Sequence, residues 1–285
     1  FAISEITMKI GSVVGAISLN TYISVPNSLG PGKLIGKYGT KEQKNYYLPK
    51  LADGQYIPCF ALTAPSAGSD AGSIPDYGIV CEGTYDGKKM IGIKLNFDKR
   101  YITLAPVASL IGLAFKLYDP DHLMGEEDEY GITCALLASD TKGVKIGRYH
   151  HPLGQGFVNG PVEGKDVFIP LDNIIGGPAM AGQGWRMLME CLSAGRAGSL
   201  PTGAITCMKV AAYASGLYAR VRHQFKHPIG DFEGVQESLA EIAGLTFIGD
   251  AMRHFTLAAV DRGEQPSVAS AMSKYHTTEF SRVVI

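Results

Sequence analysis

One segment of the chain reads Phe60-Ala-Leu-Thr-Ala-Pro-Ser-Ala-Gly-Ser-Asp-Ala-Gly72, and its character changes halfway. Its first residues are apolar and strand-like, whereas Thr63, Pro65, Gly68 and Ser69 break that pattern. Glycine lets a backbone approach a ligand closely, and successive backbone N–H groups in a turn form a concavity for anions such as a pyrophosphate. The segment therefore fits either a ligand-binding loop or an ordinary turn after a strand.

A second segment lies further along the chain and reads Asn96-Phe-Asp-Lys-Arg-Tyr-Ile-Thr-Leu-Ala-Pro-Val-Ala108. Together the two segments resemble the paired signatures of the acyl-CoA dehydrogenase family. The first is similar to that family's Thr-x-Pro-x-Ala-Gly-Ser-Asp loop. The second is similar to its Lys-x-aromatic-Ile-Thr strand, with Tyr101 where many members carry Trp.

The resemblance covers nearly the whole chain, in the family's order. Three longer stretches are most similar to the large bacterial fatty acyl-CoA dehydrogenases of β-oxidation: Pro26-Asn-Ser-Leu-Gly-Pro-Gly32, Lys99-Arg-Tyr-Ile-Thr-Leu-Ala-Pro106 and Met180-Ala-Gly-Gln-Gly-Trp-Arg-Met-Leu188.

The composition is typical of a globular chain with a large core. Its 285 residues suffice for about two or three packed units, and 46% of them are hydrophobic. A formal net charge of −1 does not provide the basic surface of a nucleic-acid binder, so no nucleic-acid partner is expected. The apolar stretch 10–25 is broken by Gly, Ser, Asn and Thr, which predicts a buried helix rather than a membrane span. The start at Phe1, without Met, suggests a fragment.

The cysteines indicate a reducing compartment, with buried thiols and no zinc site or disulfide framework. They are odd in number, form no CxxC pair, and stand at Cys59, Cys81, Cys134, Cys191 and Cys207. The acidic run 125–130 reads as a solvated loop rather than a metal site, so no metal is expected.

The chain divides by pattern into helices, then strands, then helices. A helix is expected at residues 1–24, followed by a loop at 26–32. A capping box at Thr40 and Gln43 predicts a second helix, which should end near Asp53 and Gly54. Strand-length runs follow at 78–82, 89–94, 109–115, 132–137 and 165–170, and Asp86-Gly87 indicates a hairpin. Helical periodicity returns at 184 and persists to 285, with a break at 261–266 and no terminator after the last helix.

These patterns predict an α+β chain of helices, then a β-domain, then a helical bundle. This order matches the fold of the acyl-CoA dehydrogenases, and the resemblance implies that the chain is truncated at both ends. The expected domains are the end of an N-terminal helical domain at 1–55, a middle β-sandwich or barrel at 56–176, and the start of a C-terminal helical bundle at 177–285.

The resemblance implies FAD as cofactor and gives several residues a role toward it. Thr63 would hydrogen-bond the pyrimidine edge of the flavin, while Gly68 and Ser69 would face the pyrophosphate. Tyr101 would lie flat against the isoalloxazine, and Thr103 would reach the hydride-accepting N5. The alternative for Tyr101 is a strand aromatic packed inside the sandwich.

Arg222-His-Gln-Phe225 resembles a motif with which family members reach across a subunit interface. There an Arg and a Phe hold the diphosphate and adenine side of a neighbour's FAD, which implies a homo-oligomer in which Arg222 and Phe225 do the same. The match departs at Lys226-His227 and at Glu233, which would have to point away or be paired. The alternative is a solvated helix end with a basic cluster.

Family members use a Glu as general base, and we expect that Glu beyond Ile285. The minority position just before Arg196 is occupied by Gly195, and Glu190 reads as a polar position on an amphipathic helix. His150 and His151 precede a proline and read as surface loop residues. No catalytic residue is therefore assigned within the chain.

The resemblance implies an oxidoreductase, a flavoprotein that dehydrogenates straight-chain fatty acyl-CoA at the α,β position in β-oxidation and lipid metabolism. Electron-transfer flavoprotein is the expected electron acceptor, and the expected location is the cytoplasm or the periphery of the inner membrane. Acyl chain length would depend on a pocket near 18–24. The alternatives are an acyl-CoA oxidase or flavin monooxygenase of the same superfamily, or a non-catalytic acyl-CoA- or flavin-binding module.

Overall fold

The computed structural model describes residues 5–6, 30–152, 158–264 and 266–285. The chain forms two compact units, one of residues 21–191 and the other of residues 1–20 with 192–285. Most of the expected helix at 1–24, the loop residues 26–29 and the expected acyl pocket near 18–24 lie outside the described residues. The three expected domain boundaries remain a prediction.

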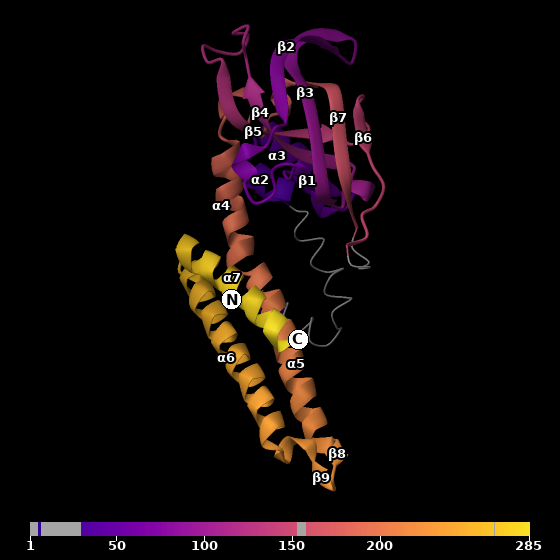
Figure 1. The fold of residues 1–285 in the computed structure, drawn as a ribbon. Helices are drawn as coiled ribbons and strands as arrows, with labels where there is room; N and C mark the ends of the chain where they lie inside the picture. Colours follow the sequence, from indigo (N-terminus) through magenta and orange to yellow (C-terminus); the bar gives the residue numbers. More distant parts are fainter. Residues whose placement is uncertain (1–4, 7–29, 153–157, 265) are drawn as a thin grey trace. The chain divides into compact units, whose positions relative to one another are not determined.

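A mixed, curled sheet forms the centre of the unit 21–191 (Figure 1). Its strands run in the order β1-β4-β2-β3-β7-β6, and β5 pairs with β4 off that path. β4 is parallel to β1 and β2, and the other pairs are antiparallel. The strands are β1 Pro58–Ala61, β2 Tyr77–Tyr85, β3 Lys88–Thr103, β4 Leu110–Tyr118, β5 Glu129–Ala138, β6 Val144–Ile146 and β7 Asn159–Pro170. The predicted strands and the Asp86-Gly87 hairpin are confirmed.

Strand β4 is buried on both faces because the sheet separates two apolar clusters. Ile111, Leu113, Phe115 and Leu117 pack into the cluster inside the curled sheet. Leu110 and Ala114 alternate with them and contribute to the cluster under the helices. This period of two is the reason that β4 reads as a continuous apolar run.

Helices α2 Gly30–Tyr38 and α3 Lys41–Ala52 cover the second cluster together with the first turns of α4. The capping box that opens α3 is present: Thr40 Oγ1 accepts from the Gln43 N–H, and Gln43 Oε1 accepts from the Thr40 N–H. The expectation of a loop up to residue 32 is wrong, because Gly30, Pro31 and Gly32 form the first turn of α2. Proline is tolerated there, since its missing N–H would have no partner inside the helix.

The second unit is helical and contains α5 Ser199–Val221, α6 Glu233–Asp261 and α7 Ser267–Val284, which pack on one another. Helix α4, Gly184–Ala197, begins in the first unit and runs into the second. A short hairpin of β8 His223–Gln224 and β9 His227–Pro228 joins α5 to α6 (Figure 1). The periodicity predicted helical structure from 184 onward with a break only at 261–266. The β8–β9 hairpin is a further interruption that it did not predict. Among the residues described, no helix is both long and apolar enough to span a membrane.

Candidate functional site

A tight turn follows β1 and carries the first quoted segment. Ala64 and Ala67 exchange two backbone hydrogen bonds, each with an N–O distance of 3.2 Å, and both alanine side chains are buried. The residues between and after them, Pro65, Ser66 and 68–70, are exposed. The buried alanines therefore fix a turn whose Gly and Ser residues face solvent, as a ligand-binding loop requires.

A buried ion pair anchors this turn to β3. Lys99 Nζ donates to the carbonyl oxygen of Leu62 at 2.9 Å and to Asp76 Oδ2 at 2.5 Å. Asp76 Oδ1 accepts from the Asp98 N–H at 2.8 Å. Burial lowers the pKa of Lys99, and the adjacent Asp76 carboxylate opposes that shift. Loss of one partner would leave a buried charge unpaired, which typically costs about 3–5 kcal/mol.

The two quoted segments lie side by side just beyond this pair. The Arg100 N–H donates to the Thr63 carbonyl at 2.9 Å. A β-bulge follows at once, because the pairing of β3 with β7 shifts register between Lys99 and Ile102. Tyr101 sits in this bulge with φ 57°, and its side chain is 54% exposed. The alternative of a Tyr101 ring packed inside the sandwich is therefore wrong.

Asn159 and His150 fix the surroundings of the Tyr101 ring. Asn159 Nδ2 donates to the Tyr101 carbonyl at 2.8 Å, so Asn159 Oδ1 is left to accept from His150 Nδ1, also at 2.8 Å. The His150 ring lies 4.8 Å from the Tyr101 ring, centroid to centroid. The Arg100 guanidinium lies 4.8 Å from the same Tyr101 ring. His150 is thus part of the support of Tyr101 and not a bare loop residue.

Thr63 and Thr103 are both half-buried, at the two ends of this arrangement. Thr63 follows β1 and is tied to Arg100, while Thr103 ends β3 opposite Asn159. Within the described part of the chain, neither threonine hydroxyl bonds another protein group, which leaves both able to bond a ligand. The first unit thus brings Thr63, Tyr101 and their supports together, and Gly68 and Ser69 extend from the same turn.

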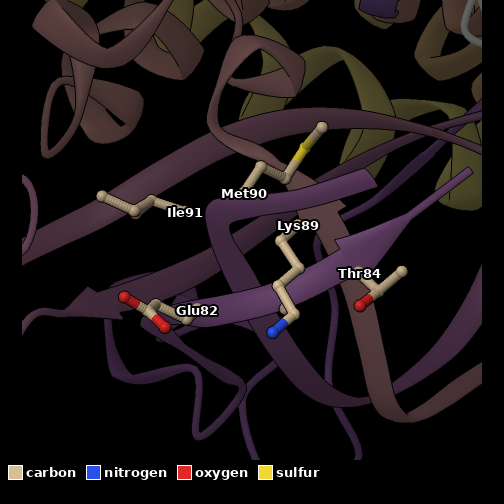
Figure 2. Close-up of a pocket in the computed structure, with 6 residues that line it drawn as sticks. Glu82, Thr84, Lys89, Met90 and Ile91 are labelled. Atoms are coloured by element: carbon tan, nitrogen blue, oxygen red, sulfur yellow. The ribbon is translucent and has the colours of Figure 1, made fainter. Parts of the chain in front are cut away.

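A separate hollow lies on the β2–β3 ribbon and contains none of these residues. Figure 2 shows its lining side chains on two neighbouring strands, where Thr84 pairs with Lys89 and Glu82 with Ile91. The side chains project from one ribbon of the sheet rather than from several converging elements. Nothing about this hollow points to a ligand.

Arg222 and Phe225 lie in the helical unit, on the turn between α5 and α6. Phe225 and Lys226 form the tip of the β8–β9 hairpin with φ of 51° and 71°. The Phe225 side chain is 87% exposed and touches Phe232 edge to face, at 6.2 Å between ring centroids. Arg222 is exposed, and Glu233 is the exposed first residue of α6, where the helix dipole favours a carboxylate. Neither the cross-subunit motif nor the alternative of a solvated helix end with a basic cluster predicted this hairpin.

The other titratable side chains considered, Glu190 and the buried cysteines, are hydrogen-bonded to or packed against other protein groups. Glu190 Oε2 accepts from Lys37 Nζ and from the Tyr38 hydroxyl, and the hydrogen bond from Lys37 is the main reason that the pKa of Glu190 is lowered. Burial raises the pKa of Cys59 and of Cys134 to about 12, so neither thiol forms a thiolate readily. In the ranges that the structure describes, no group of three His, Cys, Asp or Glu side chains could hold a metal ion.

Sequence reasoning missed Asp76, Asn159 and the roles of Lys99 and His150. Each acts through a partner far away in the sequence, and no local motif records such a pairing. A lone Asp near the start of a strand and a Lys in mid-strand were the available signals for the buried pair.

Comparison with known proteins places the whole chain in one family. Three family models match it: acyl-CoA dehydrogenase, N-terminal domain at residues 5–55, middle domain at 59–167, and C-terminal domain at 182–285. An acyl-CoA dehydrogenase of Bacillus subtilis is 30% identical over 98% of this chain and 67% of its own length. The crystal structure of an acyl-CoA dehydrogenase from Geobacillus kaustophilus is 27% identical with a TM-score of 0.82, covering 99% of this chain and 69% of that one.

A third relative matches more closely over a shorter range. Protein HemX of Proteus mirabilis is 59% identical over 103 residues, which are 36% of this chain and 61% of that protein. The chain therefore spans about two thirds or less of the length of such relatives. Others are named for short/branched-chain or very long-chain acyl-CoA, so the names of the relatives do not agree on one substrate.

Proposed function

The chain belongs to the acyl-CoA dehydrogenase family, and from that premise we propose that it serves the α,β-dehydrogenation of straight-chain fatty acyl-CoA in β-oxidation. Members of this family are FAD enzymes, so the expected cofactor class is correct. One observation carries the proposal for this chain: the Thr63 turn and the Tyr101 bulge are joined edge to edge by the bond from Arg100 N to Thr63 O. The exposed Tyr101 ring therefore stands in the bulge of β3, with the half-buried Thr63 in the adjoining turn after β1 and the half-buried Thr103 at the end of β3.

The residues present suit a flavin. Thr63 and Thr103 would hydrogen-bond the ring system, Tyr101 would lie against it, and the exposed Gly68 and Ser69 turn would receive the pyrophosphate. When bound, FAD would supply the acceptor for the hydride removed from the β-carbon of the substrate. The protein's part is to orient this group and to exclude water from it.

Arg222 and Phe225 complete the proposed FAD site from a second subunit. Both side chains are exposed in the helical unit, and a guanidinium suits bidentate contact with a diphosphate. This role requires a homo-oligomer. Electron-transfer flavoprotein remains the proposed acceptor, and a location in the cytoplasm or at the periphery of the inner membrane remains a prediction from the family.

The proposed general base lies outside the described residues. The described alternative, Glu190, is held by Lys37 and Tyr38, and its lowered pKa makes it a weak base. The chain itself would therefore contribute cofactor binding and orientation rather than proton abstraction.

A substrate and acceptor survey tests the proposal. The full-length protein, purified with FAD, should oxidise straight-chain acyl-CoA when electron-transfer flavoprotein is supplied, and should do so slowly with oxygen alone. Faster turnover with oxygen would point to an oxidase, and preference for branched substrates would correct the substrate class. Absence of turnover with every acyl-CoA, despite bound FAD, would favour a non-catalytic binding module.

A further inference from the structure

We propose that Lys99 and Asp76 are positioning residues for the flavin, because together they fix the two backbone segments that carry the proposed flavin contacts. The inference rests on the proposed function, since it concerns the same site. Neither residue is proposed to touch the cofactor or substrate. Their side chains are 0% and 1% exposed, so any influence on the site must pass through their neighbours.

The bonds of the pair reach both segments. On one side, Lys99 Nζ holds the carbonyl of Leu62, the residue before Thr63, at 2.9 Å. On the other side, Asp76 Oδ1 holds the N–H of Asp98, three residues before Tyr101, at 2.8 Å. The ion pair between Lys99 and Asp76 closes the link from the β1 turn to the β3 bulge.

The bulge leaves the backbone around Tyr101 without regular strand pairing, so other bonds must hold it in place. Regular pairing of β3 with β7 breaks between Lys99, opposite Val162, and Ile102, opposite Gly160. Tyr101 therefore lacks regular ladder pairing, and its backbone is held in the left-handed region at φ 57°. A misplacement of about 1 Å can cost about 100-fold at a reacting centre. The bonds of the pair to Leu62 and to Asp98, just before the bulge, therefore help to set where the ring stands.

A set of variants separates positioning from simple stabilisation. Asp76→Asn and Lys99→Met each leave one polar partner buried, so both should lower the melting temperature of the FAD-free protein and raise the Kd for FAD by about tenfold or more. The double variant Asp76→Leu with Lys99→Met removes both charges, which often restores stability. It leaves the Leu62 carbonyl and the Asp98 N–H without their partners, so its Kd for FAD should stay raised.

The matched control is Lys145→Met. It breaks an ion pair with Glu163 at 3.9 Å on the same sheet, where both side chains are exposed, and should leave both the melting temperature and the Kd unchanged. FAD binding is measured by quenching of flavin fluorescence. A double variant that regains both stability and wild-type affinity would overturn the proposal, as would single variants with wild-type affinity.

Hydrogen exchange gives a readout that needs no FAD. In the double variant, the amides of 62–64, 66 and 98–103 should exchange faster than in the wild type, even where global stability is recovered. Unchanged exchange there would contradict the positioning role. Failure of the wild-type protein to bind FAD would instead contradict the proposed function. The exchange data would then show by themselves whether the Lys99–Asp76 pair holds the two backbone segments in place.

Discussion

Tyr101 departs from an ordinary strand position in both backbone and exposure. It combines a positive φ with a residue exposure of 54%, and backbone strain of this kind clusters at functional positions. We expect Tyr101→Ala to leave the fold stable and to weaken FAD binding by about 2–10-fold, because a stacked aromatic contributes about 0.5–1.5 kcal/mol beyond its area. Tyr213→Ala, at another exposed ring, is the control. Equal FAD affinity of both variants by fluorescence titration would remove Tyr101 from the site.

Asp250 is a carboxylate whose protonation we expect to destabilise the helical unit. Burial pushes its pKa up, but hydrogen bonds from Lys209 and Arg253 outweigh burial, so the pKa lies below its ordinary 3.8. Glu5 and His254 lie around the same Arg253 guanidinium. A depressed carboxylate pKa stabilises the fold above the unfolded value, and that contribution is lost as the pH falls through the folded value.

Urea unfolding of the helical unit should therefore show falling stability as the pH is lowered from about 5 to 3. Asp250→Asn should flatten this slope and lower stability at neutral pH by about 1–3 kcal/mol, because Arg253 is fully buried and loses a charged partner. Glu237→Gln, at an exposed position of the same helix, should change neither quantity. An unaltered slope in Asp250→Asn would show that another group titrates.

At the scale of elements, local sequence rules predicted those structures whose cause is local. The capping box at Thr40, the hairpin at Asp86-Gly87 and the apolar runs of the strands all stand as predicted. The start of α2 was missed because Gly-Pro-Gly is typical of loops, although proline also fits a first helical turn. The support of the site could not be read locally, because the Lys99–Asp76 pair spans 23 residues and the parallel pairing of β1 with β4 spans more.

The β8–β9 hairpin escaped prediction because its turn has the wrong residues for its geometry. Two-residue turns with positive φ at both positions favour Gly or Asn, whereas this one has Phe225 and Lys226. We expect Lys226→Gly to stabilise the protein by about 0.5–1 kcal/mol, because glycine adopts φ 71° without strain. Lys142→Gly, in an exposed loop without positive φ, should instead destabilise. Thermal unfolding compares the two, and a loss of stability in Lys226→Gly would mean that the turn is unstrained.

At the scale of the whole molecule, the FAD site is proposed to need more than one chain. Arg222→Ala should weaken FAD retention by about 10–100-fold, because a charge-assisted bond contributes about 1.5–3 kcal/mol. Arg262→Ala is the control, since Arg262 is exposed and bonded to Glu264 at 2.8 Å. For both variants, FAD content is measured after gel filtration, and the mass of the particle is determined by light scattering. Equal losses in the two variants, or FAD held by a monomer, would count against a cross-subunit role.

The general base is proposed to lie outside the described residues, so we expect no abstraction of an α-proton by residues 1–285. Absence of a general base typically costs about 10²–10⁴-fold in rate, and Glu190 is occupied by Lys37 and Tyr38. Anaerobic addition of a saturated acyl-CoA to FAD-loaded residues 1–285 should therefore leave the oxidised flavin absorbance unchanged. Bleaching of that band, in a sample of verified mass, would show that a base lies within these residues. Glu190→Gln would then identify it: loss of bleaching with FAD still bound would assign the role to Glu190, and persistence would point to another carboxylate.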